Sequence, residues 1–158
     1  MKPRHFCAAA TALLLATATT AQTPAPAPSA LDLDAVQATV GNWSYRPITG
    51  GSEADFVDSG GHVRLTVRCN RTSRVVSIVR TGITAAAPYL TVTTTYGARN
   101  LAASFAAGNL TAAVAANDPL LDDIAFSRGK WAIANAGVGA LVVPSWAEAP
   151  RVFEDCRS

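Results

Sequence analysis

Two cysteines far apart in the sequence, Cys69 and Cys156, constrain the fold more than any other feature. Cys7 lies in an N-terminal segment that we expect to be removed, so the two have no competitor. Lone cysteine pairs in small exported domains typically form a disulfide, here closing a loop of roughly 88 residues and removing about 4 to 5 kcal/mol of unfolded-state entropy. The alternatives are a reactive thiol or a metal ligand, for which His62 would be the only histidine left.

Residues 1–21 have the three parts of an export signal: a basic start, an apolar run over 6–15 and small residues at the end. We expect cleavage after Ala21, with Ala18 as the alternative. The apolar run is too short for a stable membrane anchor, so we expect no membrane span after its removal. The signal predicts a periplasmic or extracellular protein.

The next segment, 22–30, alternates proline with alanine and is typical of an extended linker. The remaining residues, 31–158, suffice for a single domain with one core. Without Lys2 and Arg4 the 13 basic residues fall to 11, which equals the 11 acidic residues. This neutral balance gives no support for a nucleic-acid partner.

The middle of the chain has the alternating pattern of antiparallel strands. In His62–Cys69 every second residue is apolar, which places Cys69 on the buried face, and Arg74–Arg80 follows as the partner strand of a hairpin. The other expected strands are Trp43–Tyr45, Asp55–Val57, Tyr89–Tyr96, Leu101–Phe105 and Leu110–Ala116. A weak helix is the alternative for the last two.

The final forty residues combine helices with another hairpin. Asp118 and Pro119 predict the start of a short helix, as an N-cap followed by proline at the first helical position. A hairpin over Trp131–Ala134 and Leu141–Val143 follows.

The terminal segment is expected to be a second helix. Ser145 and Glu148 match a capping box that would start it at Trp146, whereas Pro150 favours a kink or a later start. Its large apolar residues, Trp146, Val152 and Phe153, are expected to be buried. The predicted fold is mainly β: an antiparallel sandwich or partly open barrel with two short helices and one disulfide.

Three stretches support a resemblance: Leu65–Cys69 (LTVRC), Asp118–Ile133 (DPLLDDIAFSRGKWAI) and Val143–Arg157 (VPSWAEAPRVFEDCR). They resemble a group of small exported proteins of unassigned function from sphingomonad-type alphaproteobacteria. In architecture, the order of strands, helix, hairpin and terminal helix is distantly similar to envelope proteins of the invasion-associated locus B type. Neither resemblance implies catalytic residues.

No catalytic, metal or cofactor motif is present in the sequence. His62, with serines and carboxylates elsewhere, permits a Ser/His/Asp arrangement by count, but no nucleophile elbow accompanies it. We therefore expect His62 to be an exposed strand residue. The adjacent Asp122 and Asp123 would point in different directions on a helix, and the helix dipole explains Asp122 without a cation.

Basic side chains are the better candidates for binding. Five arginines lie on or beside the predicted hairpin: Arg64, Arg68, Arg71, Arg74 and Arg80. Their forked guanidinium groups suit carboxylates or phosphates, unless they pair with the domain's own acids. The turn with Arg128 and Lys130 is a second candidate, unless it neutralises Glu154 and Asp155.

The sequence thus predicts a non-enzymatic envelope protein that binds another protein or an anionic envelope ligand, with Arg64, Arg68, Arg74, Arg128 and Lys130 as candidate contacts. The alternatives are a small periplasmic hydrolase and a structural accessory protein of the envelope.

Overall fold

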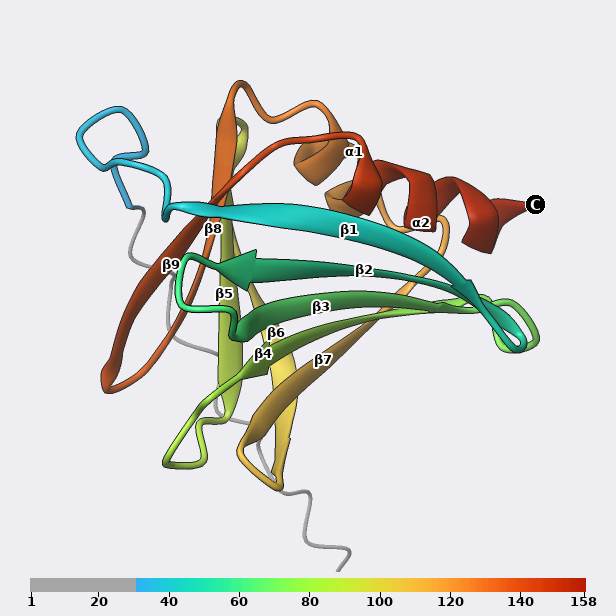
Figure 1. Ribbon diagram of the computed structural model, residues 1–158, viewed down its shortest axis with the longest axis horizontal. Coiled ribbons are helices and arrows are strands. Elements are labelled where there is room, and N and C mark those ends of the chain that lie inside the picture. Colours follow the sequence, from blue (N-terminus) through green and yellow to red (C-terminus); the bar gives the residue numbers. More distant parts are fainter. Residues whose placement is uncertain (1–30) are drawn as a thin grey trace, which may run out of the picture.

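The computed structural model describes residues 31–158 (Figure 1). The expected export signal, 1–21, and the expected linker, 22–30, lie outside the described residues. The strands are β1 (Gly41–Ile48), β2 (Gly51–Asp58), β3 (Val63–Asn70), β4 (Val75–Thr81), β5 (Tyr89–Thr94), β6 (Gly97–Ala106), β7 (Asn109–Ala115), β8 (Lys130–Asn135) and β9 (Val138–Pro144). The helices are α1 (Pro119–Ala125) and α2 (Glu148–Arg157). The predicted mainly β fold with two short helices is confirmed.

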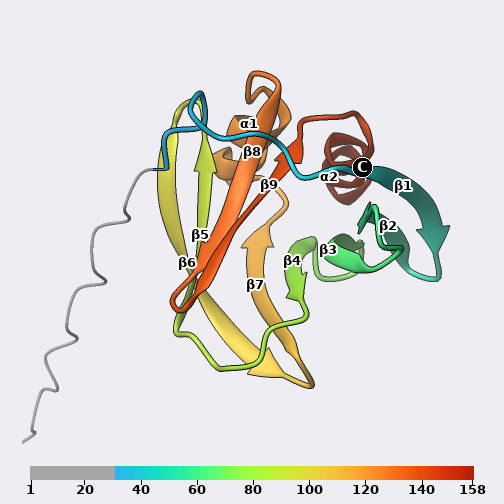
Figure 2. The same cartoon turned by 60° about the vertical axis from the view of Figure 1, so that its left-hand side comes forward.

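All nine strands join one antiparallel sheet in the order β1-β2-β3-β4-β7-β6-β5-β8-β9, which curves into a half-barrel (Figures 1 and 2). Strand β6 makes this curvature possible because it changes neighbour partway along. Its residues 97–102 pair with β5, and its residues 103–106 pair with β7. The two segments for which a helix was the alternative are therefore the strands β6 and β7.

The curvature brings the first and last strands of the sheet together at one end. The backbone N–H of Thr39, just before β1, donates to Val142 O of β9 at 2.8 Å. Trp43 Nε1 donates to Pro144 O at 2.9 Å, and the Trp43 ring stacks on Trp131 with centroids 6.3 Å apart. Core side chains from both edges of the sheet thus meet in one interior.

Helix α1 begins as its sequence predicts. Asp118 is the N-cap, with Oδ1 accepting from Leu120 N at 2.9 Å, and Pro119 is the first helical residue. Leu120, Leu121 and Ile124 form the buried stripe. Neither α1 nor α2, the helices within residues 31–158, has the length and apolar run of a membrane-spanning helix.

Helix α2 begins later than the capping box predicts. It starts at Glu148 and its N-cap is Ala147, and no side chain within residues 31–158 caps it. Ser145 is held outside the helix because its N–H donates to Gly129 O at 3.1 Å, directly after β9. Pro150 consequently lies in the first helical turn, where a backbone N–H has no intrahelical acceptor to lose.

The apolar side of α2 packs into the concave face of the sheet, mainly on β2 and β3 (Figure 2). Val152 and Phe153 are fully buried there, as expected. The prediction for Trp146 is wrong, since 45% of this residue is exposed. Because α2 begins only at Glu148, Trp146 lies in the connection rather than on the buried face of the helix.

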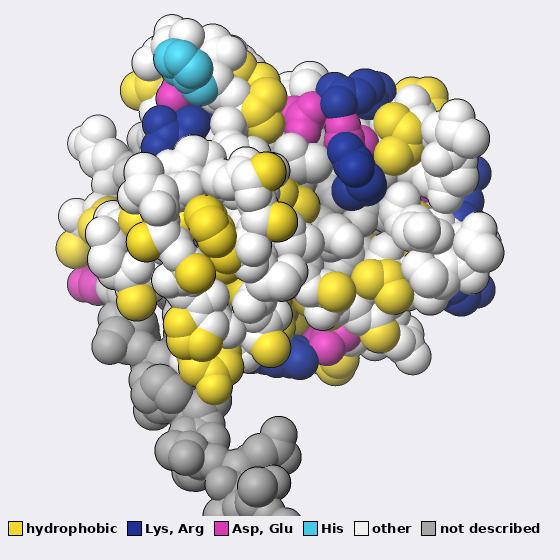
Figure 3. All heavy atoms as spheres, turned by 90° about the horizontal axis from the view of Figure 1, so that it is seen from below, with side chains coloured by type: hydrophobic (Ala, Val, Ile, Leu, Met, Phe, Trp, Pro, Cys, Tyr) yellow, Lys and Arg dark blue, Asp and Glu magenta, His cyan; other side chains and the backbone are white. Residues whose placement is uncertain are grey.

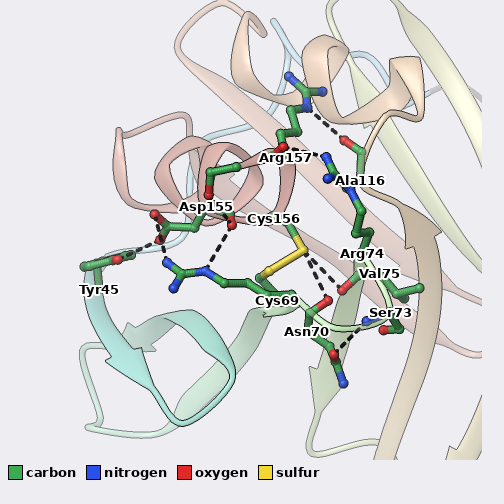
Figure 4. The surroundings of a disulfide bond; sticks show 12 residues. Tyr45, Cys69, Asn70, Ser73, Arg74, Val75, Ala116, Asp155, Cys156 and Arg157 are labelled. Atoms are coloured by element: carbon green, nitrogen blue, oxygen red, sulfur yellow. Dashed lines mark hydrogen bonds and ion pairs between the residues drawn. A yellow bond between two sulfur atoms is a disulfide. The ribbon is translucent and has the colours of Figure 1, made fainter.

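The disulfide between Cys69 and Cys156 is confirmed and joins β3 to the last turn of α2, with Cα atoms 5.4 Å apart (Figure 4). Both cysteines are buried. Gly51 lies beside this bridge, and a Cβ on it would come within 2.0 Å of Cys69 O. The close pairing of β2 with β3 at the disulfide therefore requires glycine at position 51.

Candidate functional site

The predicted cluster of five arginines is distributed over four different environments. On the face that Figure 3 shows, basic side chains lie next to acidic ones and form no continuous basic patch. The arginines of the cluster are Arg64, Arg68, Arg71, Arg74 and Arg80. Each must therefore be judged by its own partners.

Arg68 belongs to an ion-pair network on the outer face of β1, β2 and β3. It pairs with Glu53, which also pairs with Arg46. Arg46 reaches Asp55 at 2.7 Å, and Asp55 accepts from Thr66 Oγ1 at 2.5 Å. Glu53 is only 1% exposed, so the two arginines are its compensating charges and are committed to that role.

Arg71 and Arg74 hold the C-terminal end of α2 (Figure 4). Arg71 Nε donates to Asp155 O at 3.2 Å, and Arg74 donates to Arg157 O. Tyr45 Oη donates to Asp155 Oδ2 at 2.7 Å. Guanidinium groups on the last carbonyls of a helix satisfy acceptors that the helix itself leaves open. Arg74 thus has a structural partner within the fold.

Arg80 points into the interior of the half-barrel. It follows Val76 and Ile78 on the buried face of β4 and is 3% exposed. Its guanidinium donates to Ile133 O at 2.6 Å and to Gly139 O at 2.8 Å, both in the β8–β9 hairpin. No carboxylate within residues 31–158 pairs with it, so its charge is solvated by backbone carbonyls alone.

Arg64 lines an open cavity of about 640 Å³ at the end of the β2–β3 hairpin, which we name the basic pocket. The lining residues are Gly61, His62, Val63, Arg64, Thr81 and Gly82. Asp58 is the acid beside it: Arg64 NH1 lies 3.2 Å from Asp58 Oδ2, and His62 Nδ1 lies 3.5 Å from Asp58 Oδ1. The hydrogen bond from the His62 backbone N–H keeps the pKa of Asp58 below its usual value, so this acid stays ionised.

Positive charge exceeds negative charge around the basic pocket. Burial, together with the positive charge of Arg64, lowers the pKa of Arg80 to about 10, which leaves Arg80 charged at neutral pH. Asp58 lies beside Arg64 and His62, and no carboxylate within residues 31–158 pairs with the buried Arg80. An anion in the pocket would reduce the repulsion between the two arginines.

Arg128 and Lys130, the other predicted basic turn, do not extend this pocket. Lys130 Nζ donates to Val36 O at 2.5 Å. Arg128 lines a separate cavity of about 350 Å³ together with Asp32 and Asp34. The expectation that this turn neutralises Glu154 and Asp155 is wrong, because Asp155 lies at the other end of the molecule against Tyr45 and Arg71.

The geometry around His62 offers no assembled nucleophile. The His62 side chain is 78% exposed, and its ring makes no hydrogen bond to a hydroxyl or thiol group within the described residues. The same part of the chain brings no three metal-ligating side chains together. The predicted alternative of a hydrolase therefore gains no supporting contact and stays a prediction.

Sequence reasoning missed two buried charged positions, of which its own periodicity could have found one. Arg80 has the same parity as Val76 and Ile78, which places it on the inward face of a strand. Glu53 has the opposite parity to the core residues Ala54 and Phe56, so it lies on the outer face and is buried there by Arg46 and Arg68, on a strand that was expected only from Asp55 onward. Neither residue type is an expected core member, and so neither residue was expected to be buried.

Comparisons with protein-family models, with curated proteins and with solved structures find no match for this chain.

Proposed function

We propose that the chain is an exported, non-enzymatic binding module of the cell envelope, and that its ligand presents a carboxylate or phosphate group to the basic pocket. The observation that supports this proposal is the charge imbalance: Asp58 is paired with Arg64, while the buried Arg80, whose charge is felt by Arg64, has no carboxylate partner within residues 31–158. An anionic ligand would supply the missing negative charge.

Arg64 is the residue suited to contact the ligand directly. Its side chain is 42% exposed, and NH1 alone is engaged with Asp58. The remaining N–H groups of its planar fork suit two oxygens of one carboxylate or phosphate. Arg80 is buried on the other side of the sheet, so its positive charge would attract the ligand without contacting it.

The backbone around the pocket is accessible to a ligand. Gly61 and Gly82 have φ angles of +78° and +70°, and a Cβ on either would meet nothing within 4 Å. Glycine in this conformation leaves the main chain open to close approach. The ligand can therefore approach the turns as well as the Arg64 side chain.

Titration of the ¹⁵N-labelled protein with inorganic phosphate and with citrate tests the anion site. Both probes should shift the backbone amides of residues 61–64 and 81–82. Arg64→Gln should weaken binding about tenfold or more, the effect of losing a charged hydrogen bond. Arg128→Gln, an exposed arginine at the separate cavity, is the matched control and should bind like the wild type. Equal losses in the two variants, or no shift at these amides, would overturn the proposal.

Export rests on residues 1–21 and is tested separately. Mass spectrometry of the protein from the periplasmic fraction should find a chain that begins at Gln22. A chain that retains Met1, or that carries a lipid on Cys7, would contradict the processing that the proposal assumes.

A further inference from the structure

Strand β1 is an edge of the sheet with an unpaired side. Within residues 31–158, Gly41–Ile48 makes no backbone hydrogen bond except those to β2. The opposite edge, β9, is partly covered, because Thr39 N donates to Val142 O. Alternate residues of an antiparallel edge strand direct N–H and C=O groups outward, and such a row is a template for another strand.

A cleft of about 270 Å³ adjoins this free edge, between β1 and the start of α2. Its lining residues are Trp43, Ser44 and Tyr45 from β1, and Ala147, Glu148 and Arg151 from the helix. The guanidinium of Arg151 lies 4.1 Å above the ring of Tyr45. The cleft therefore has an aromatic wall on the strand side and a charged wall on the helix side.

Glu148 is the unsatisfied group of this cleft. Its Oε2 is buried and has no hydrogen-bond partner within the described residues, and the same is true of Ser145 Oγ nearby in the chain. A buried carboxylate oxygen without a donor costs free energy that a ligand's N–H group can recover. A positively charged group satisfies it best.

We propose that the β1 edge binds an extended segment of a partner protein, which adds to the sheet as a strand and places a lysine or arginine side chain against Glu148. The backbone of β1 would supply affinity, and the cleft would supply the preference for a basic residue. Pro47 lacks an N–H, so the pairing is limited to the part of β1 near Gly41–Tyr45. This surface is separate from the basic pocket. It would bind a positively charged side chain, whereas the basic pocket would bind an anion.

The test uses two capped peptides of alternating valine and threonine, one with a central lysine and one with glutamate in its place. The lysine peptide should shift the amides of residues 41–45 in the ¹⁵N-labelled chain, and it should bind about tenfold more tightly than the glutamate peptide. N-methylation of alternate peptide amides should abolish binding, because these amides form the strand pairing.

Glu148→Gln should weaken binding of the lysine peptide about tenfold, whereas the matched variant Glu154→Gln, an exposed acid on the same helix, should not. Arg64→Gln should bind this peptide like the wild type. The proposal of a peptide site and the proposal of an anion site are therefore tested independently. Equal affinity for both peptides, insensitivity to Glu148→Gln, or no binding of the lysine peptide would overturn the proposal. Sedimentation showing a stable dimer with shifted 41–45 amides would assign the edge to a second copy and also overturn it.

Discussion

The two helices are held in place at opposite ends and by different kinds of contact. Helix α1 is fixed at its N-terminus: Asp118 caps it, and Arg99 pairs with the same carboxylate at 2.5 Å. Helix α2 has no side-chain cap at its N-terminus among the described residues and is fixed at its C-terminus. There the disulfide and Arg74 tie it to β3 and to the turn before β4.

This difference separates local from long-range determinants of structure. The cap of α1 depends on residues adjacent in sequence, and its partner Arg99 lies 19 residues away. The contacts that hold α2 span 83 and 87 residues. Local contacts resist fraying of one helix end, whereas long-range contacts should determine whether the terminal segment docks at all.

The largest effect is expected from the buried side of α2. Phe153→Ala should lower the free energy of unfolding by about 3 to 5 kcal/mol, because it leaves a cavity beneath the helix. Phe126→Ala at the end of α1 is the control; Phe126 is 69% exposed and its loss should cost less than about 0.5 kcal/mol. Denaturant melts of the oxidised variants measure both values. A similar loss in both variants would show that α2 is not the more deeply packed helix.

Removal of the disulfide should be the next largest effect. The double variant Cys69→Ser with Cys156→Ser should lose about 2 to 5 kcal/mol of stability. Each single variant should cost nearly as much as the double, since either one abolishes the bond. The unfolded, unreduced wild type should show no free thiol on labelling. Labelling of both Cys69 and Cys156 in the unfolded, unreduced protein would refute the pairing.

A smaller effect is expected at the cap of α1. Asp118→Ala should cost about 1 kcal/mol, the usual value for loss of an N-cap. The hydrogen bond from Arg99 holds the pKa of Asp118 below its ordinary value of 3.8, so this carboxylate stabilises the fold above that pH. The stabilisation is lost as the pH falls through the lowered pKa of the folded state.

Acid titration of thermal stability measures this pH dependence. Asp118→Asn should lose less stability than the wild type when the pH is lowered from neutral to about 3. Asp34→Asn, an exposed acid, should follow the wild type. An unchanged acid profile in Asp118→Asn would mean that Arg99 and Asp118 do not pair in solution.

The smallest effect is expected at Ser145. Its Oγ is buried, has no hydrogen-bond partner in the part of the chain that the structure describes, and caps neither helix, so Ser145→Ala should change stability by less than about 0.5 kcal/mol. A denaturant melt that shows a loss above about 1 kcal/mol would restore the capping box that the sequence suggests. Both helices would then begin with a side-chain cap.

The sequence was most informative where the determining residues are neighbours. The alternation around Cys69 and the cap at Asp118 predict β3 and α1, and both are confirmed. The disulfide spans 87 residues and is confirmed too, but it was predicted from the count of cysteines after the expected export signal. The start of α2 was not predictable in this way. It depends on Gly129, which holds Ser145 outside the helix through a contact between distant parts of the chain.

The candidate site was predictable only in part, for the same reason. Arg64 was identified by composition, but the commitment of Arg68 to Glu53 and of Arg74 to the end of α2 depends on the tertiary fold. The inward direction of Arg80 follows from strand parity and could have been inferred. Its lack of a carboxylate partner within residues 31–158 could not, since that requires knowledge of which strand faces β4.

The position of α2 in the chain has a consequence for the order of folding. Its residues follow the nine strands found within residues 31–158, so they leave the ribosome after β1, β2 and β3, which they cover. Until Phe153 arrives, the concave side of those strands exposes apolar surface, and Cys69 has no partner thiol. Contacts of such long sequence separation form slowly. A nascent chain of this protein therefore passes through an aggregation-prone interval that lasts at least until α2 has been synthesised.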